Sequence, residues 1–148
     1  MRSQTSRRSA ILSALATLFS DLIDGTGLYR SHVRSVSPRL LFWDEIQEFP
    51  AIHMNAGSES RVYQGGGQKD RYLSATIRCY VNEENSIDAL EALLEDVETV
   101  LDENGRLAYL DSTGVQQFTR DIVIVDISTD EGVLDPIGVG EILIQVKY

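Results

Sequence analysis

A chain of 148 residues, with 43% hydrophobic and 24% charged residues, has the size and composition of one ordinary globular domain. Its formal net charge of −10 argues against a protein that grips nucleic acid on an open surface or binds anionic membranes, because both need clustered Lys and Arg. Cys79 is the single cysteine, which excludes a disulfide within the chain and predicts a reducing cytoplasm as its compartment.

An amphipathic helix is the first predicted element, with its start near Thr5 or Ser6 and its end at 25–27, where Gly-Thr-Gly stands. The Arg7-Arg8 pair before its apolar run is also compatible with a twin-arginine export signal. Polar residues interrupt the run and acidic residues follow it, so the helix is the preferred interpretation. No stretch approaches the roughly 20 apolar residues that cross a bilayer. The apolar residues at helical spacing are Ile11, Leu15, Leu18 and Leu22, with Leu12 and Phe19 beside them.

Two strands and a long excursion are predicted next. The strands cover Leu28–Ser37 and Phe49–Met54, and one helical turn is predicted around Leu40–Trp43. Asn55–Asp70 is polar and glycine-rich. This composition indicates either a mobile loop or a long hairpin with its tip around Arg61–Gln64.

The predicted core is centred on Asp70–Leu101. Its first half alternates, as in a strand with one buried face, and its second half has the apolar spacing of a helix. Asn85 and Asp88 occupy capping positions at the start of that helix, and Asn104-Gly105 supplies its stop. The inward residues of the strand are Leu73, Ala75, Ile77, Cys79 and Val81, and those of the helix are Ile87, Leu90, Leu94, Val97 and Leu101.

The last third of the chain contains two more predicted strands. Residues 106–119 are polar and turn-rich, with no element predicted. Asp121–Ser128 is nearly continuously apolar, which predicts a strand in the centre of the sheet. After the loop Thr129–Val139, Gly140–Tyr148 alternates as a closing strand. We therefore expect an α+β fold, with a mainly antiparallel four- to five-stranded sheet and two helices packed on one face.

No catalytic constellation is visible in the sequence. Gly65–Gly67 lacks the spacing of a phosphate loop, and residues 126–137 lack the glycine and glutamate positions of a calcium loop. Cys79 has no adjacent base, and no serine stands in a nucleophile elbow. His32 and His53 could meet near the acidic residues at 44–48, which leaves a metal site open as an alternative. No cofactor is predicted.

The order of these features resembles a known family. An N-terminal helix leads to Phe-Pro-Ala-Ile-His-Met at 49–54, a glycine-rich segment, and Arg-Tyr-Leu-Ser-Ala-Thr-Ile-Arg-Cys-Tyr-Val at 71–81, which runs directly into a Leu-rich helix. Gly-Val-Gly-Glu-Ile-Leu-Ile-Gln-Val-Lys-Tyr closes the chain at 138–148. Over nearly its whole length this layout resembles the tail terminator (tail completion) proteins of long-tailed bacteriophages, including the lambda-type minor tail proteins.

This resemblance implies a small structural subunit, one domain over residues 1–148, that assembles into a hexameric ring. The ring would cap the tail tube, stop its polymerisation and offer a surface for head attachment. It implies no enzyme activity and no cofactor, with the tube protein and a head-tail connector protein as partners. DNA would pass through the ring without specific binding. The subunit would be assembled in the host cytoplasm and reside in the virion, at the head-proximal end of the tail.

Ring and tube contacts would lie, by position, on the glycine-rich segment and on the loop after residue 128. The candidate interface residues are Ser58, Arg61, Tyr63, Gln64, Gln68, Lys69, Asp70, Asp130 and Glu131. Two other classes stay open at this point. One is another head-tail connector, an adaptor or stopper, and the other is a small-molecule binding α+β module. An enzyme is the least favoured interpretation and would need a metal bound at one of the histidines.

Overall fold

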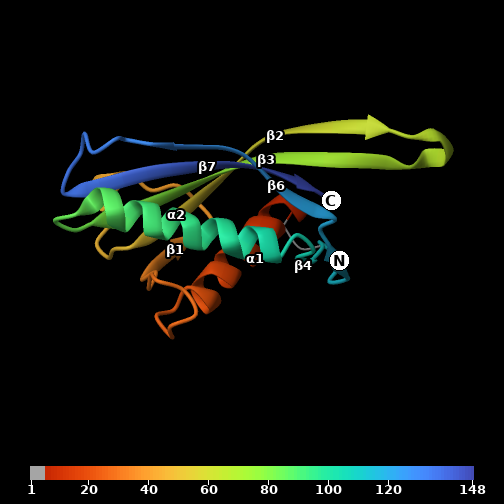
Figure 1. Ribbon diagram of the computed structural model, residues 1–148. Coiled ribbons are helices and arrows are strands. Elements are labelled where there is room, and N and C mark those ends of the chain that lie inside the picture. Colours follow the sequence, from red (N-terminus) through yellow and green to blue (C-terminus); the bar gives the residue numbers. More distant parts are fainter. Residues whose placement is uncertain (1–5) are drawn as a thin grey trace.

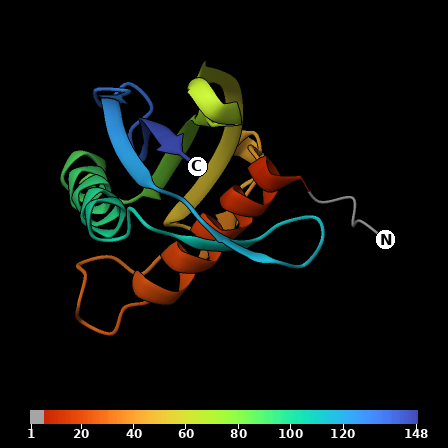
Figure 2. The ribbon, with the colours of Figure 1, turned by 90° about the vertical axis from the view of Figure 1, so that its right-hand side faces the viewer.

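Five strands form the main sheet in the order β1-β2-β3-β7-β6 (Figure 1). The computed structural model describes residues 6–148. All neighbouring strands are antiparallel except β1 and β2, which are parallel. Both helices lie on one face of this sheet (Figure 2), so the predicted α+β fold is confirmed. The strands are β1 Ser35–Ser37, β2 Ala51–Tyr63, β3 Lys69–Asn82, β6 Asp121–Thr129 and β7 Ile137–Lys147.

The core lies between β3 and the helix α2, Ser86–Glu103. The five predicted inward residues of β3 are all at most 1% exposed, because each faces the helices. Four of the five predicted stripe residues of α2 are also buried. Ile87 is the exception, with 56% exposure, and it lies beside Gly132 in the turn between β6 and β7. Leu93 and Val100 are fully buried in its place, which widens the apolar stripe.

The helix α1, Arg7–Leu22, packs under β1 and β2. The Ser6 hydroxyl accepts a hydrogen bond from the Ser9 backbone N–H at 3.1 Å, so Ser6 caps the helix as expected. Thr5, the alternative start, lies outside the described residues. Leu18 and Leu22 are only half-buried. The side chains that α1 buries most fully are Ile11, Leu12, Leu15 and Phe19.

Two short segments differ from the sequence prediction. The strand predicted at Leu28–Ser37 is only the three-residue β1, because a turn held by the Asp24 carboxylate on the Thr26 N–H begins an irregular segment after α1. Residues 106–119, predicted as irregular, contain the hairpin β4 (Ala108–Leu110) and β5 (Gln116–Phe118). The Asp111 carboxylate accepts hydrogen bonds from two backbone N–H groups of its turn, a local device that composition does not reveal.

The glycine-rich segment is part of a long hairpin. β2 runs to Tyr63, and β3 begins at Lys69 after a 3-10 turn at Gly65–Gly67. Gly66 and Gly67 have positive φ, which the tight turn requires. The hairpin alternative is therefore confirmed and the loop alternative is wrong. The tip lies at the glycines, a few residues beyond its predicted place.

β6 is an edge strand, which corrects the prediction of a central place in the sheet. Its apolar run arises because both faces of the strand carry apolar residues. Ile122 faces the helices and is 5% exposed, whereas Val123 on the opposite face is 47% exposed. A bulge between Ile124 and Asp126 leaves Val125 without a partner in the register and 57% exposed.

Neither helix in residues 6–148 combines the length and the hydropathy that a membrane crossing requires.

Candidate functional site

The most prominent surface feature is the end of the β2–β3 hairpin, residues 58–71, which we call the arm. The last partner pair between β3 and β7 is Tyr72–Lys147, so beyond it the two strands of the hairpin run on without β7. The N–H of Tyr148 donates to the carbonyl of Arg71, which marks where the body of the sheet ends. Figure 1 shows the arm projecting well past the rest of the molecule.

The tip of the arm is ordered and partly apolar. The Gln64 N–H donates to the Gln68 carbonyl at 2.7 Å, and the Gln64 side-chain amide donates to Asp70 at 3.3 Å. Val62 is 48% exposed and Tyr63 is 71% exposed. An apolar pair held on a hydrogen-bonded protrusion costs little entropy to dock, which suits it to a protein contact.

The base of the arm is tied to the body by charged groups. Asp70 accepts from Arg120 at 3.0 Å and lies 4.0 Å from the Lys147 ammonium. Glu59 accepts from Arg61 at 2.9 Å and from the hydroxyl of Tyr148. Burial raises the pKa of Glu59, but these two hydrogen bonds outweigh it, so the pKa lies below its usual value. These contacts fix the direction in which the arm leaves the sheet.

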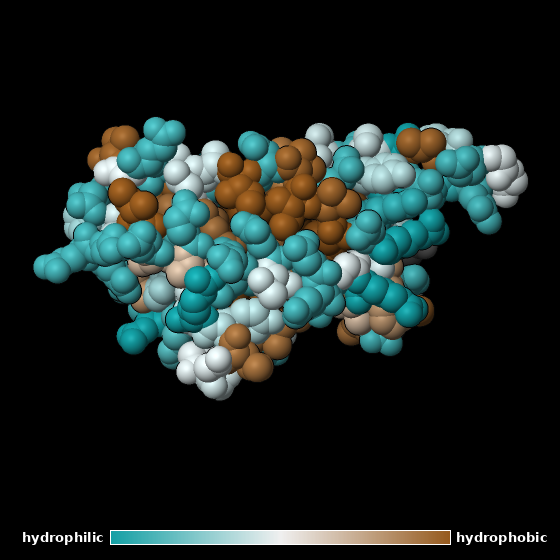
Figure 3. Space-filling model, viewed as in Figure 1, coloured by the Kyte–Doolittle hydropathy of each residue, from teal (hydrophilic) through white to brown (hydrophobic). Residues whose placement is uncertain are grey.

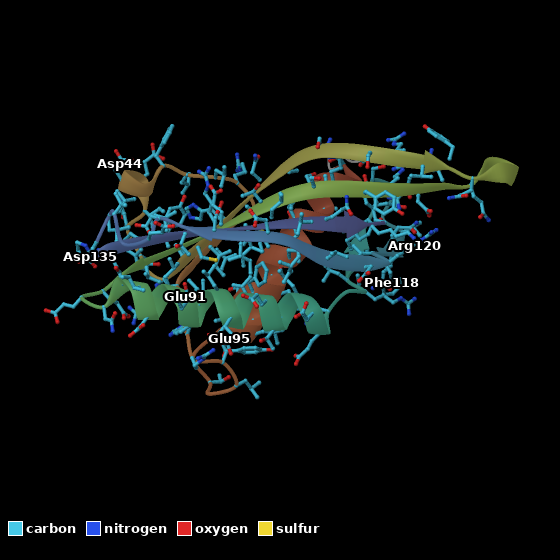
Figure 4. The ribbon with its side chains drawn as sticks, turned by 45° about the horizontal axis from the view of Figure 1, so that its top comes forward. Asp44, Glu91, Glu95, Phe118, Arg120 and Asp135 are labelled. Carbon is cyan, nitrogen blue, oxygen red and sulfur yellow. The ribbon has the colours of Figure 1, made fainter. Side chains whose placement is uncertain are left out.

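A basic recess lies beside this base. It has a volume of about 190 Å³. The Arg7 guanidinium donates to the Tyr109 hydroxyl at 2.8 Å and lies 5.1 Å from the centre of the Tyr148 ring. Figure 4 shows Arg120 and Phe118 at this end of the body. The lining residues are Arg7, Lys69, Arg71, Gln117, Phe118, Arg120 and Tyr148.

The predicted interface residues do not form one site. Seven of them lie on the arm: Ser58, Arg61, Tyr63, Gln64, Gln68, Lys69 and Asp70. Asp130 and Glu131 lie in the turn between β6 and β7, which is at the opposite end of β3 and β7. The Asp130 carboxylate accepts from the N–H groups of Leu134 and Val139, so it holds its own turn closed.

An apolar surface along β6 was missed by sequence reasoning, because the strand was placed in the centre of the sheet. Val123 and Val125 are 47% and 57% exposed, and Leu143 of β7 is 37% exposed. We call these three residues the β6 surface. Ile127 is 37% exposed but is the register partner of the buried Ile142, so it lies on the face that carries the helices. Figure 3 shows hydrophobic side chains gathered in the middle of this face, over β6 and above α2. The two-sided apolar pattern of residues 121–128 was the available signal.

The ionisable residues that a metal site or a catalytic site would need are not clustered in the part of the chain that the structure describes. Within residues 6–148 no three His, Cys, Asp or Glu side chains are placed to hold a metal ion. His32 pairs through its backbone with Asp24, whereas His53 stacks at a tilt on Tyr80, so the two histidines have different partners. A recess of about 320 Å³ is lined by Arg30, His32, Arg34 and Glu83, among others.

The buried side chain of His53 should make the fold less stable in mild acid. The side chain is 0% exposed, its Nδ1 accepts from the Leu41 N–H at 3.3 Å, and its Nε2 has no hydrogen-bond partner among the described residues. Burial lowers the pKa of His53. As the pH falls below about 6.5, the unfolded chain therefore binds a proton that the folded chain resists, and the free energy of unfolding should decrease.

Urea unfolding at about pH 7.5 and about pH 5.5 measures this loss. The substitution His53→Leu should reduce it, and His32→Leu, at an exposed histidine, should leave it unchanged. Equal pH dependence in the two variants would contradict the assignment to His53.

Cys79 should be inert in the folded protein. It is 0% exposed on the inner face of β3, and burial raises its pKa to about 12. We expect a thiol reagent at neutral pH to label it only after unfolding, as counted by mass spectrometry. Rapid labelling without denaturant would show that the core opens around β3.

The chain is similar in sequence and fold to known proteins. A model of the family described as Bacteriophage Tail Tube Terminator Protein matches residues 5–148. The tail tube terminator protein p142 of Escherichia phage T5 is 33% identical over 150 residues, which cover 95% of this chain and 92% of that protein. Among solved structures, a chain in the virion of a native gene transfer agent particle has a similar fold. The TM-score is 0.53 at 9% identity, over 96% of this chain and 93% of that one.

Proposed function

The chain belongs to the bacteriophage tail tube terminator family and is a structural tail terminator; on this premise, we propose that its copies form a hexameric ring that caps the tail tube. The ring stops polymerisation of the tube protein and offers the surface to which a head-tail connector protein attaches. The chain acts by these contacts and not by catalysis. It is assembled in the host cytoplasm, and in the virion it occupies the head-proximal end of the tail.

The arm is the observation that carries this proposal. A subunit that closes a ring and rests on a tube needs a rigid body with a part that reaches a neighbour. Here the body is a sheet covered by two helices, and the arm extends from it with Val62 and Tyr63 exposed near its tip. We assign the seven arm residues to contacts with a neighbouring subunit or with the tube, and Asp130 and Glu131 to the opposite end of the subunit.

The net negative charge of the chain supports passage of DNA through the ring without specific binding. A formal charge of −10 repels phosphate, so a bore lined by this chain would not hold DNA in place. The basic recess lies at one end of the body, where Asp70 already neutralises part of its charge.

An assembly assay tests the proposal. Purified tube protein of the same phage is polymerised with and without the chain, and tube lengths are measured by negative-stain microscopy. We expect tubes that stop growing and carry a ring-shaped cap at one end. Tubes of unchanged length, together with a chain that stays monomeric in light scattering at high concentration, would refute it.

A further inference from the structure

The β6 surface is an unpartnered apolar edge. Among the strands of residues 6–148, β6 pairs with β7 alone, so its other edge is open. Two of its nine residues, Val123 and Val125, are exposed valines, and Leu143 extends the surface onto β7. Exposed apolar edges are normally blocked, since they invite association with other chains. The surface therefore points to a contact that forms in the assembled protein.

Extension of the sheet across this edge is disfavoured by the bulge in β6. The bulge leaves Val125 out of the register and interrupts the regular row of backbone groups that a further strand would need. The exposed side chains of β6 remain available for packing. The occupant is therefore expected to lie across the surface and bury its side chains.

The distribution of acidic and basic residues over the chain indicates what packs on the β6 surface. Residues 86–103 and 121–136, which form α2, β6 and the following turn, hold twelve of the 23 acidic residues and no Lys or Arg. The rest of the chain holds the other eleven acidic residues and all 13 basic ones. Figure 4 shows Glu91, Glu95 and Asp135 on this acidic side, away from Arg120. Arg30 pairs with Glu95 at 2.9 Å and lies 3.8 Å from Asp96, and the other acidic residues of this side favour a partner that brings apolar side chains with a positive surround.

The arm has this character. Val62 and Tyr63 are exposed near its tip, and the basic residues Lys69 and Arg71 lie on the facing strand, with Lys69 directly opposite Tyr63. Its two acidic residues, Glu59 and Asp70, are already engaged by Arg61, Tyr148, Arg120 and Lys147. A contact between two β6 surfaces would instead bring two acidic sides together, which Coulomb repulsion opposes.

We propose that the β6 surface of one subunit receives the arm of a second copy of the chain. The contact is heterologous, since it joins two different surfaces, and repetition of it can close a ring. This inference rests on the proposed ring-forming function and names the two surfaces that form the ring. It assigns the seven arm residues to the neighbouring subunit and leaves tube contact to other parts of the chain.

Thiol cross-linking between two variants tests it. One chain carries Val125→Cys and the other carries Val62→Cys, at positions that are both exposed. The native Cys79 is buried and should not react with the cross-linking reagent. A short bis-maleimide is added to each variant alone and to their mixture, with and without tube protein. We expect a cross-linked dimer only in the mixture, with little in either variant alone.

A mixture of Val62→Cys with Leu28→Cys is the matched control, because Leu28 is 80% exposed and lies outside both surfaces. Dimers of the Val125→Cys chain with itself would show a symmetric contact and overturn the inference. Failure of the two variants to cross-link, while they still form rings and cap tubes, would also overturn it and leave the proposed function intact. Loss of ring formation and capping in the unmodified chain would refute both.

Discussion

A chain whose arm is cut back to the body should fold normally and leave tail tubes uncapped. Ser60 and Tyr72 are partners in the hairpin register, so an Asn-Gly turn between them can replace residues 61–71. None of the removed residues is buried. The loss of Asp70 leaves Arg120 without its partner, but the Arg120 side chain is 61% exposed and stays hydrated, so the loss should cost little stability.

We expect this variant to keep the circular dichroism spectrum and the unfolding midpoint of the parent chain. In the assembly assay, tubes should reach the lengths seen without any terminator. Normal capping by the shortened chain would show that capping does not need the arm.

A finer version of this test uses single residues. Aromatic side chains at the centre of a protein contact commonly carry about 2 kcal/mol or more, which corresponds to roughly thirtyfold in affinity. Tyr63→Ala should therefore raise the chain concentration needed for capping by at least about tenfold. Leu28→Ala, at an equally exposed apolar position outside the arm, should leave it unchanged.

The core was predictable because the chain there shows one clear period at a time. Ile77 and its neighbours on β3 alternate, and Leu94 and its neighbours on α2 recur every three or four residues. Burial of one face is the reason for both patterns, so the sequence predicts the contact as well as the elements. Asn85 caps α2 as expected, with its side chain accepting from the N–H of Asp88.

The edges of the sheet were less predictable. The pattern reports only that a face is buried, and at an edge the covering chain can be another subunit. The apolar run of β6 is that of a strand covered on both faces, and no pattern within one chain distinguishes cover by its own fold from cover by another subunit. The arm raised a similar ambiguity, since a solvated hairpin and a mobile loop share the composition of residues 55–70. Both ambiguities fall on the proposed assembly surfaces, where a single subunit does not bury its own side chains.

Leu94→Ala should cost roughly 2–5 kcal/mol in the free energy of unfolding, measured by urea denaturation. Leu94 is 1% exposed, and it packs over Gly140 of β7. A Cβ at Gly140 would lie 3.0 Å from Leu94 Cδ2, so the glycine is what allows α2 to approach the sheet here. Because Gly140 has no side chain to move into the space, we expect a cost near the upper end of that range.

The close approach of Gly140 and Leu94 allows a second test. Gly140→Ala alone should destabilise the fold, because its methyl group crowds Leu94. In the Leu94→Ala background the same methyl group has room, so the two changes together should cost less than the sum of their separate costs. Ile87→Ala is the control within α2, and at 56% exposure it should cost less than about 1 kcal/mol. Additive costs at Leu94 and Gly140 would mean that helix and sheet do not touch there, and the body that positions the arm would need a different account.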